Sequence, residues 1–236
     1  MTAIFKKEFK GYFSSPLGFV FLAAFAFVSA LFFALYNLLQ GIGDPTYVFS
    51  NISLLLVLMI PVLTMRSFAE EKSKKTDRLL LTAPISVWEI VLGKFLAACA
   101  VFAMALVIML IYPLILSFYT EIKVGEVFGT YLGFFLMGAS FIAIGIFVSN
   151  MTENLLISAI ASFVVLFVFY LMDWIAYATS NSPIISTVAR FMSLTARYTD
   201  LSMGIINIVS ILYYLSAIAV FIILTVYHTE KRKFVK

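Results

Sequence analysis

The sequence predicts an all-α polytopic membrane protein with six transmembrane helices. Hydrophobic residues make up 63% of its 236 residues, charged residues only 12%, and the mean hydropathy is +1.08. Because soluble domains carry about a quarter charged residues, this composition excludes a soluble fold. The apolar residues form six blocks, each long enough to cross a bilayer as a helix. We therefore expect a single transmembrane (permease) domain over residues 1–236, without a separate soluble catalytic domain.

Polar segments and Gly- or Pro-containing turns separate the six apolar blocks. The first block is too long for the core of a signal peptide, so we expect it to be retained as a span. The expected spans are approximately 17–39, 47–65, 95–118, 127–149, 155–172 and 204–227.

Residues 1–16 have the pattern of an amphipathic helix lying in the membrane interface. Its aromatic side chains fall on one face and its lysines largely on the other, and Pro16 marks its end. The aromatic face consists of Phe5, Phe9, Tyr12 and Phe13, and the basic face of Lys6, Lys7 and Lys10.

The distribution of Lys and Arg predicts the orientation. Thirteen of the sixteen lie on the side of the N-terminus, in the first helix, the 66–94 interval and the C-terminal tail; Lys123, Arg190 and Arg197 lie on the other side. Since cytoplasmic loops carry the excess of positive charge, both termini are expected in the cytoplasm.

The 66–94 interval is the longest polar stretch between apolar blocks. Its pattern predicts two short helices joined by a bend at 82–84, and Ser86 with Glu89 forms a capping box for the second. We expect this segment to lie flat between spans two and three. The alternative is a plain basic loop held at the membrane surface by its lysines.

Residues 173–203 are expected to form an external amphipathic helix. Ile184, Val188, Phe191, Tyr198 and Leu201 fall near one helical face, and Arg190 and Arg197 share the other with Thr187. The alternative is a surface helix whose role is limited to closing the bundle.

Glycines recur at four-residue spacing at the start of span four. Gly125, Gly129 and Gly133 would form a flat stripe that allows another helix to approach closely. Such a stripe serves packing within one chain or dimerisation, and the motif does not choose between them.

No catalytic constellation is visible in the sequence. The single histidine, His228, lies outside the apolar centre of the spans, which disfavours a two-glutamate intramembrane protease built on Glu70 and Glu71, since such proteases also need histidines in their helices. Gly93 and Lys94 lack the earlier glycine of a phosphate-binding loop, so this chain is not expected to bind ATP that way. Carboxylates are absent from the centres of the spans, which disfavours an ion-coupled carrier. Any energy for transport is therefore expected from a cytoplasmic partner.

The segment EEKSKKTDRLLLTAPISVWEIVLGKFLA, residues 70–97, resembles the segment between spans two and three of ABC-2-type transporter permeases. The leading segment KKEFKGYFSSPLGF resembles the amphipathic first helix of that family. The segments RYTDLSMGIIN and LTVYHTEKRK resemble the gliding-motility-type (GldF-like) permease subunit branch. The resemblance extends over essentially the whole chain.

The resemblance implies a permease that dimerises with a second copy or a related permease and docks on a separate ATP-binding cassette subunit. That partner would bind ATP and Mg; no cofactor or metal is expected in this chain. The 66–94 interval would be the coupling segment, with the 150–154 turn as a smaller contact. The residues this assigns to ATPase coupling are Glu70, Glu71, Arg78, Leu79, Leu80, Leu81, Pro84, Trp88, Glu89, Asn150 and Glu153.

Two physical features agree with that assignment. Leu79 to Leu81 would form a compact apolar knob for a groove on the partner, as in many interface hot spots. Glu70 and Glu71 would link the coupling segment to Lys6, Lys7 or Lys10, while the basic residues of the segment would pair with the partner or with lipid headgroups.

The expected function is the permease subunit of an ABC exporter in the bacterial cytoplasmic membrane, with membrane lipids and no nucleic acid among its partners. One alternative is a non-transporting membrane scaffold that relays ATPase work or a signal. A secondary transporter is the other. The substrate is not predicted by the sequence.

Overall fold

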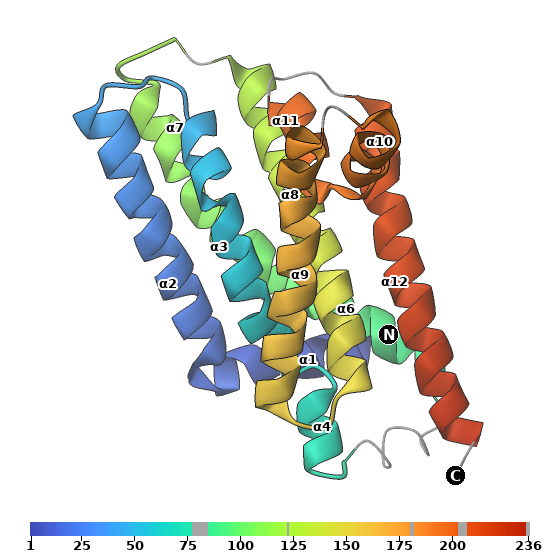
Figure 1. Cartoon of the computed structure of the whole chain (residues 1–236). Helices are drawn as coiled ribbons and strands as arrows, with labels where there is room; N and C mark the ends of the chain where they lie inside the picture. The colour runs from blue at the N-terminus through green and yellow to red at the C-terminus, as the bar shows by residue number, and fades with distance from the viewer. Residues whose placement is uncertain (77–84, 122, 180–181, 203–206, 235–236) are drawn as a thin grey trace.

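The computed structural model describes residues 1–76, 85–121, 123–179, 182–202 and 207–234. Helices account for nearly all of these residues, and none of them lies in a β-strand. Figure 1 shows long helices running side by side, with both termini at one end of the bundle and α7, α10 and α11 at the other. We call the first end, which also carries α1 and α4, the lysine-rich end.

Six helices in the described part are long and apolar enough to cross a membrane. Span three is formed by α6 (Val87–Met109) and α7 (Ile111–Leu116), and the others begin close to the expected residues. They are α2 (Pro16–Phe32) continued by the π-helix η1 (Phe33–Leu39), α3 (Thr46–Thr64), α8 (Val124–Met151), α9 (Leu155–Ala178) and α12 (Ile208–Phe234). The fold class is therefore confirmed.

The expectation of two short helices in the 66–94 interval needs a correction. Helix α4 (Ala69–Ser73), which Figure 1 shows projecting at the lysine-rich end, lies in the first part of the interval, whereas the expected helix with Leu79 to Leu81 lies outside the described residues. The second expected helix is not a separate helix. Ser86 does cap a helix, since its Oγ accepts from the Glu89 amide at 3.3 Å, but that helix is α6, which continues directly into span three. Polar residues at the start of α6 concealed this continuity in the sequence.

Helix α8 is the central element of the bundle, and most of its residues are buried. Its glycines lie at contacts with three different helices: Gly133 against Leu201 of α11, Gly138 against Phe102 of α6, and Gly145 against Thr64 of α3. Gly129 is also buried, whereas a Cβ added to Gly125 would meet no atom within 4 Å. At Gly133 the glycine stripe therefore packs within this chain.

The segment between spans five and six forms two helices, α10 (Pro183–Met192) and α11 (Leu194–Ser202). The break between them follows from Ser193, whose Oγ accepts from the Ala196 amide at 3.0 Å and caps α11. The single apolar face expected over this segment is therefore divided. Ile184, Val188 and Phe191 remain exposed on α10, while Tyr198 and Leu201 are buried against the bundle.

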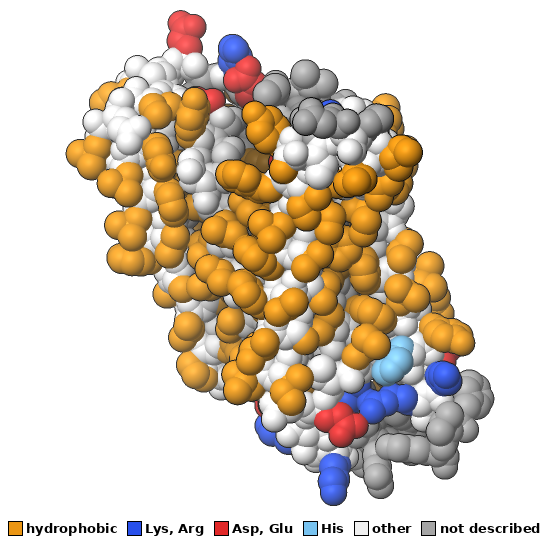
Figure 2. Space-filling view, viewed as in Figure 1, with side chains coloured by type: hydrophobic (Ala, Val, Ile, Leu, Met, Phe, Trp, Pro, Cys, Tyr) orange, Lys and Arg blue, Asp and Glu red, His pale blue; other side chains and the backbone are white. Residues whose placement is uncertain are grey.

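Apolar side chains cover the middle of the surface, and charged side chains gather at its two ends (Figure 2). Helices α9 and α12 contribute much of this surface, since most of their residues are at least partly exposed. An apolar middle with charged ends matches a bilayer, in which charged groups remain at the polar interfaces.

Candidate functional site at the lysine-rich end

Helix α1 (Thr2–Ser14) crosses the bundle at the lysine-rich end and packs on α6. Extended backbone at Ser15 and Pro16 at the first position of α2 turn the chain from α1 into the first span. The close approach depends on Gly93, because a Cβ there would lie 2.8 Å from Cγ2 of Ile4. One face of α1 therefore lies directly against the start of span three.

Ile4, Glu8 and Tyr12, spaced four residues apart, form the inward face of α1. The Tyr12 hydroxyl donates to the carbonyl oxygen of Leu63, 3.2 Å away in the last turn of α3. Burial raises the pKa of the Tyr12 phenol, so this hydroxyl stays protonated as a donor. The expected aromatic face is offset from this inward face: Phe5, Phe9 and Phe13 stack along α1 and are partly exposed.

Lys94 is the centre of an ion-pair cluster between α1, α4 and α6. Its side chain is 1% exposed, and its ammonium lies 3.0 Å from a carboxylate oxygen of Glu8 and 3.0 Å from one of Glu71. It also donates to the carbonyl oxygen of Ser67 at 2.6 Å and lies 5.1 Å from the ring centroid of Phe68. The ammonium of Lys94 is thus directed at α1, at α4 and at the turn between α3 and α4 that carries Ser67.

Lys7 completes the charge balance of this cluster. Its ammonium lies 3.4 Å from Glu71 and 3.8 Å from Glu8, so two carboxylates meet two ammonium groups. Glu8 and Glu71 are largely buried, at 18% and 15% side-chain exposure. Because a buried charge is costly without a partner, moving any one of these helices away would leave the others with unpaired charges. We call Lys7, Glu8, Glu71 and Lys94 the Lys94 cluster.

A second set of ion pairs holds the two ends of α4. Arg66 binds Glu70 with two nitrogens, one of them at 3.0 Å, and donates to Ser15 Oγ at 2.6 Å. Lys74 lies 2.6 Å from the same glutamate. Glu70 therefore pairs within its own segment, while Glu71 reaches Lys7 of α1.

Ser149 of α8 anchors the start of α4. Its hydroxyl oxygen accepts from the backbone amides of Phe68 and Ala69, both at 3.2 Å, and it donates to the carbonyl oxygen of Met65 at 3.1 Å. These amides belong to the first turn of α4, where no partner within the helix is available. The end of span two is thus tied to the end of span four.

The 150–154 segment connects α4 to span six. Asn150 is 1% exposed, and its side-chain amide donates to the carbonyl oxygen of Thr225 at 3.1 Å and to Thr229 Oγ1 at 2.9 Å. The backbone carbonyl oxygen of Asn150 accepts from the ammonium of Lys72 in α4. Glu153 is 72% exposed and pairs with Arg232 at 3.0 Å. Of these two predicted contact residues, only Glu153 presents its side chain at the surface.

The remaining predicted coupling residues fall into two groups. Trp88 is exposed and Glu89 partly exposed on the first turn of α6, where Glu89 pairs with the amino group of Met1 at 3.1 Å. The others lie outside the described residues: Arg78, Leu79, Leu80, Leu81 and Pro84.

Sequence reasoning missed Glu8, Lys94 and Ser149. Glu8 had a usable signal, since it lies between two apolar residues at helical spacing, where a charged residue needs a buried partner. Lys94 had a similar signal, because it is a charged residue inside the helix that Ser86 begins. No pattern in the sequence indicated Ser149.

The profile of the ABC-2 family transporter proteins matches residues 34–227 of this chain. The chain belongs to this family. The match extends from the end of span one to span six and includes the α4 region, the start of α6 and the central helix α8. No curated protein matched the chain in a sequence search.

Membership of the ABC-2 family agrees with the fold: six apolar helices make this a multi-pass membrane protein of the permease type. The family's membrane subunit is normally non-catalytic. In the described part, no group of three or more His, Cys, Asp and Glu side chains could hold a metal ion.

Proposed function

We propose that this chain is the permease subunit of an ABC exporter, driven by a separate cytoplasmic ATPase that docks at the lysine-rich end. The observation that carries the proposal is the Lys94 cluster. It joins α1, α4 and α6, so a force applied to the coupling segment would act on the first three spans together.

Hydrogen bonds from α4 would carry the same force further into the bundle. Ser149 ties α4 to the central helix α8, and Asn150 ties α8 to α12. A displacement of α4 would therefore act on spans two, four and six as well as on span three. Partly buried networks of this kind transmit motion when they have two discrete arrangements.

The lysine-rich end is proposed to face the cytoplasm. Of the fourteen Lys and Arg residues in the described ranges, eleven belong to segments at this end, against Lys123, Arg190 and Arg197 in segments at the other. This asymmetry supports a bacterial cytoplasmic membrane protein with both termini inside. It also puts the exposed residues Trp88 and Glu153 where a soluble subunit could reach them.

The functional unit is proposed to be a dimer of permeases, of the same chain or of a related one, with a transport path at their interface. The exposed apolar surfaces of α9 and α12 would face either lipid or the second permease. The segments 197–207 and 224–233 support the gliding-motility-type (GldF-like) branch.

The test is co-purification of the ATP-binding subunit from native membranes in mild detergent. The chain has two tryptophans, both exposed: Trp88 at the lysine-rich end and Trp174 near the opposite end. We expect Trp88→Ala to weaken or abolish co-purification, because large aromatic residues dominate interface energetics, and the matched Trp174→Ala to retain it. Absence of an ATP-binding protein with the parent chain, or equal retention by both variants, would contradict the proposed docking.

A further inference from the structure

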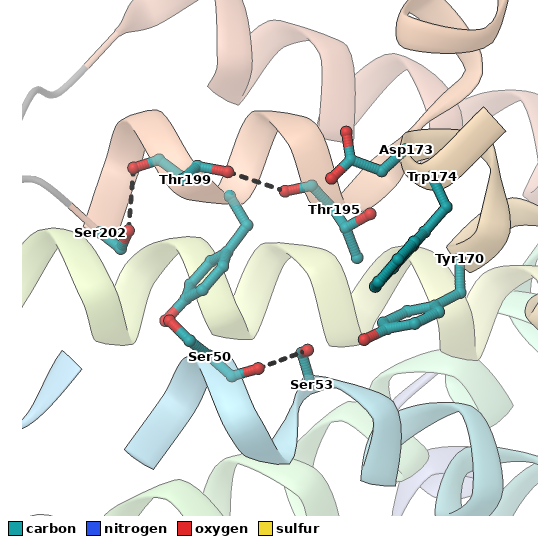
Figure 3. Close-up of a pocket in the computed structure, with 9 residues that line it drawn as sticks. Ser50, Ser53, Tyr170, Asp173, Trp174, Thr195, Thr199 and Ser202 are labelled. Carbon is teal, nitrogen blue, oxygen red and sulfur yellow. Dashed lines mark hydrogen bonds between the residues drawn. The ribbon is translucent and has the colours of Figure 1, made fainter. Parts of the chain in front are cut away.

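A polar cavity lies at the end of the bundle opposite the lysine-rich end, between α3, α9 and α11. Its volume is about 180 Å³, smaller than the ~300–1,000 Å³ of pockets for drug-sized ligands. Figure 3 shows Tyr170 and Trp174 extending from α9, with Thr195 and Thr199 on α11 and Ser50 and Ser53 on α3. Asp173, Tyr198 and Ser202 also line it. A cavity of this size suits a headgroup or a small molecule.

Four of the hydroxyl groups around the cavity, those of Ser50, Ser53, Thr199 and Ser202, are arranged as acceptors. Ser53 donates to the carbonyl oxygen of Ser50 at 2.7 Å, and Ser202 to that of Thr199 at 2.8 Å. Ser50 and Thr199 likewise donate to carbonyl oxygens one turn earlier in their helices. Each proton is thus used within its own helix, and each oxygen keeps lone pairs for a ligand.

Asp173 adds a negative charge to this acceptor-rich lining. It is partly buried, and no hydrogen bond or ion pair to it is found within the described ranges. The guanidinium of Arg197, on the facing helix α11, lies over the ring of Tyr213, 5.5 Å from its centroid, and forms no ion pair with Asp173 in the described part. A carboxylate in a partly enclosed site gains from a cationic hydrogen-bond donor.

Tyr198 supplies an independent sign that a ligand belongs here. Its side chain is 5% exposed, it lines the cavity, and its buried hydroxyl has no hydrogen-bond partner. A buried polar atom without a partner is costly, so a ligand in contact with this oxygen would remove that cost. The rings of Tyr170 and Trp174 offer faces to which a cation is attracted.

We propose that this cavity binds an ammonium group, which belongs either to an aminophospholipid headgroup or to a free small amine. The ammonium would donate to Asp173 and to the serine and threonine oxygens and lie against the aromatic rings. Asp173 is the single carboxylate among the lining residues, so a bare divalent metal ion would find too few charged ligands. This inference concerns binding and does not depend on the proposed ATPase.

The fluorescence of Trp174 provides the test. In a Trp88→Phe background it is the sole tryptophan, and it lines the cavity. The full chain in phosphatidylglycerol nanodiscs is titrated with ethanolamine hydrochloride, with ethylene glycol as a neutral match and sodium chloride for ionic strength. We expect a saturable change with ethanolamine alone. Asp173→Asn should weaken it at least about tenfold, the loss expected for a charge-assisted bond, while Glu126→Gln, changed at an exposed pair with Lys123, should not.

Nanodiscs that contain phosphatidylethanolamine distinguish the two sources. If the emission is already shifted and the response to ethanolamine is lost, the headgroup is the ligand; if the response persists, the ligand is a free amine. An equal response to ethylene glycol, no saturable response in either lipid, or an unchanged response in Asp173→Asn would overturn the proposal. Should Asp173→Asn fail to fold, the comparison of ethanolamine with ethylene glycol in the parent still decides.

Discussion

The ammonium of Lys94 lies 3.0 Å from the carboxylate of Glu8, although 86 positions separate the two residues. One belongs to the helix that crosses the end of the bundle and the other to the start of span three. Glu71 shares the same ammonium, so three helices meet at one buried charge. We regard this contact as the centre of the proposed coupling.

Removing that ammonium should destabilise the protein strongly. Lys94→Met leaves Glu8 and Glu71 partly buried with only Lys7 nearby, and we expect a loss of about 3–5 kcal/mol, as when one partner of a buried ion pair is removed. Thermal unfolding in detergent measures it. Lys74→Met is the matched control, since Lys74 is 66% exposed and its pair with Glu70 should contribute at most about 1 kcal/mol. Equal shifts of Tm in the two variants would contradict the buried role of Lys94.

Ser149→Ala should loosen α4 from the bundle. It removes the acceptor of the Phe68 and Ala69 amides, which then lack a partner at a cost of about 1–3 kcal/mol. We expect faster proteolysis within the 66–94 segment. Ser140→Ala is the control: Ser140 is equally buried, but its hydroxyl donates to Leu136 O in its own helix. Identical digestion of both variants would show that the hydroxyl of Ser149 does not hold α4.

Gly93→Val should separate α1 from α6. An added Cβ would lie 2.8 Å from Ile4 Cγ2 and 3.3 Å from the amide nitrogen of Phe5, so overpacking should cost about 1–3 kcal/mol. Tryptic cleavage at the lysines of α1 should accelerate. Gly11→Ala lies on α1 itself, and no atom is within 4 Å of its added Cβ, so it should leave α1 in place and slightly stabilise it. Unchanged cleavage in Gly93→Val would argue against the close contact.

The double variant Glu70→Gln and Glu71→Gln should uncouple the permease from ATP hydrolysis without preventing membrane insertion. The ion pairs of Glu70 with Arg66 and Lys74 are lost and the Lys94 cluster keeps only Glu8 as its anion, while the apolar spans are unaffected. In the reconstituted complex, ATP should still be hydrolysed, but the ATP-dependent change in the chain's tryptophan emission should fall severalfold relative to the parent chain. Glu126→Gln, at the opposite end, serves as the control. Full coupling in the double variant would contradict the proposed role of Glu70 and Glu71 in coupling.

Hydropathy predicted the six spans well, because a bilayer requires about 20 apolar residues wherever a helix crosses it. It misplaced the start of span three, since α6 begins at Val87 and carries Glu89 and Lys94 before its apolar part. The pattern of residues 184–201 predicted one amphipathic face, but the cap at Ser193 divides the segment into two helices with different surroundings.

The candidate site was predicted only in part. The pairing of Glu71 with Lys7 was among the expected links between the coupling segment and the first helix, and its distance is 3.4 Å. The partners of Lys94 could not be predicted, because a contact across 86 positions depends on how α1 crosses α6. The roles of the coupling residues in ATPase docking stay predictions.

Photo-crosslinking in native membranes tests the central claim most directly. A photoreactive amino acid replaces Trp88 at the lysine-rich end or Phe128 at the opposite end, both of which are exposed. The account predicts a crosslink from position 88, and not from position 128, to a protein that binds ATP. No such crosslink from position 88, or crosslinks to an ATP-binding protein from position 128, would contradict docking at the lysine-rich end.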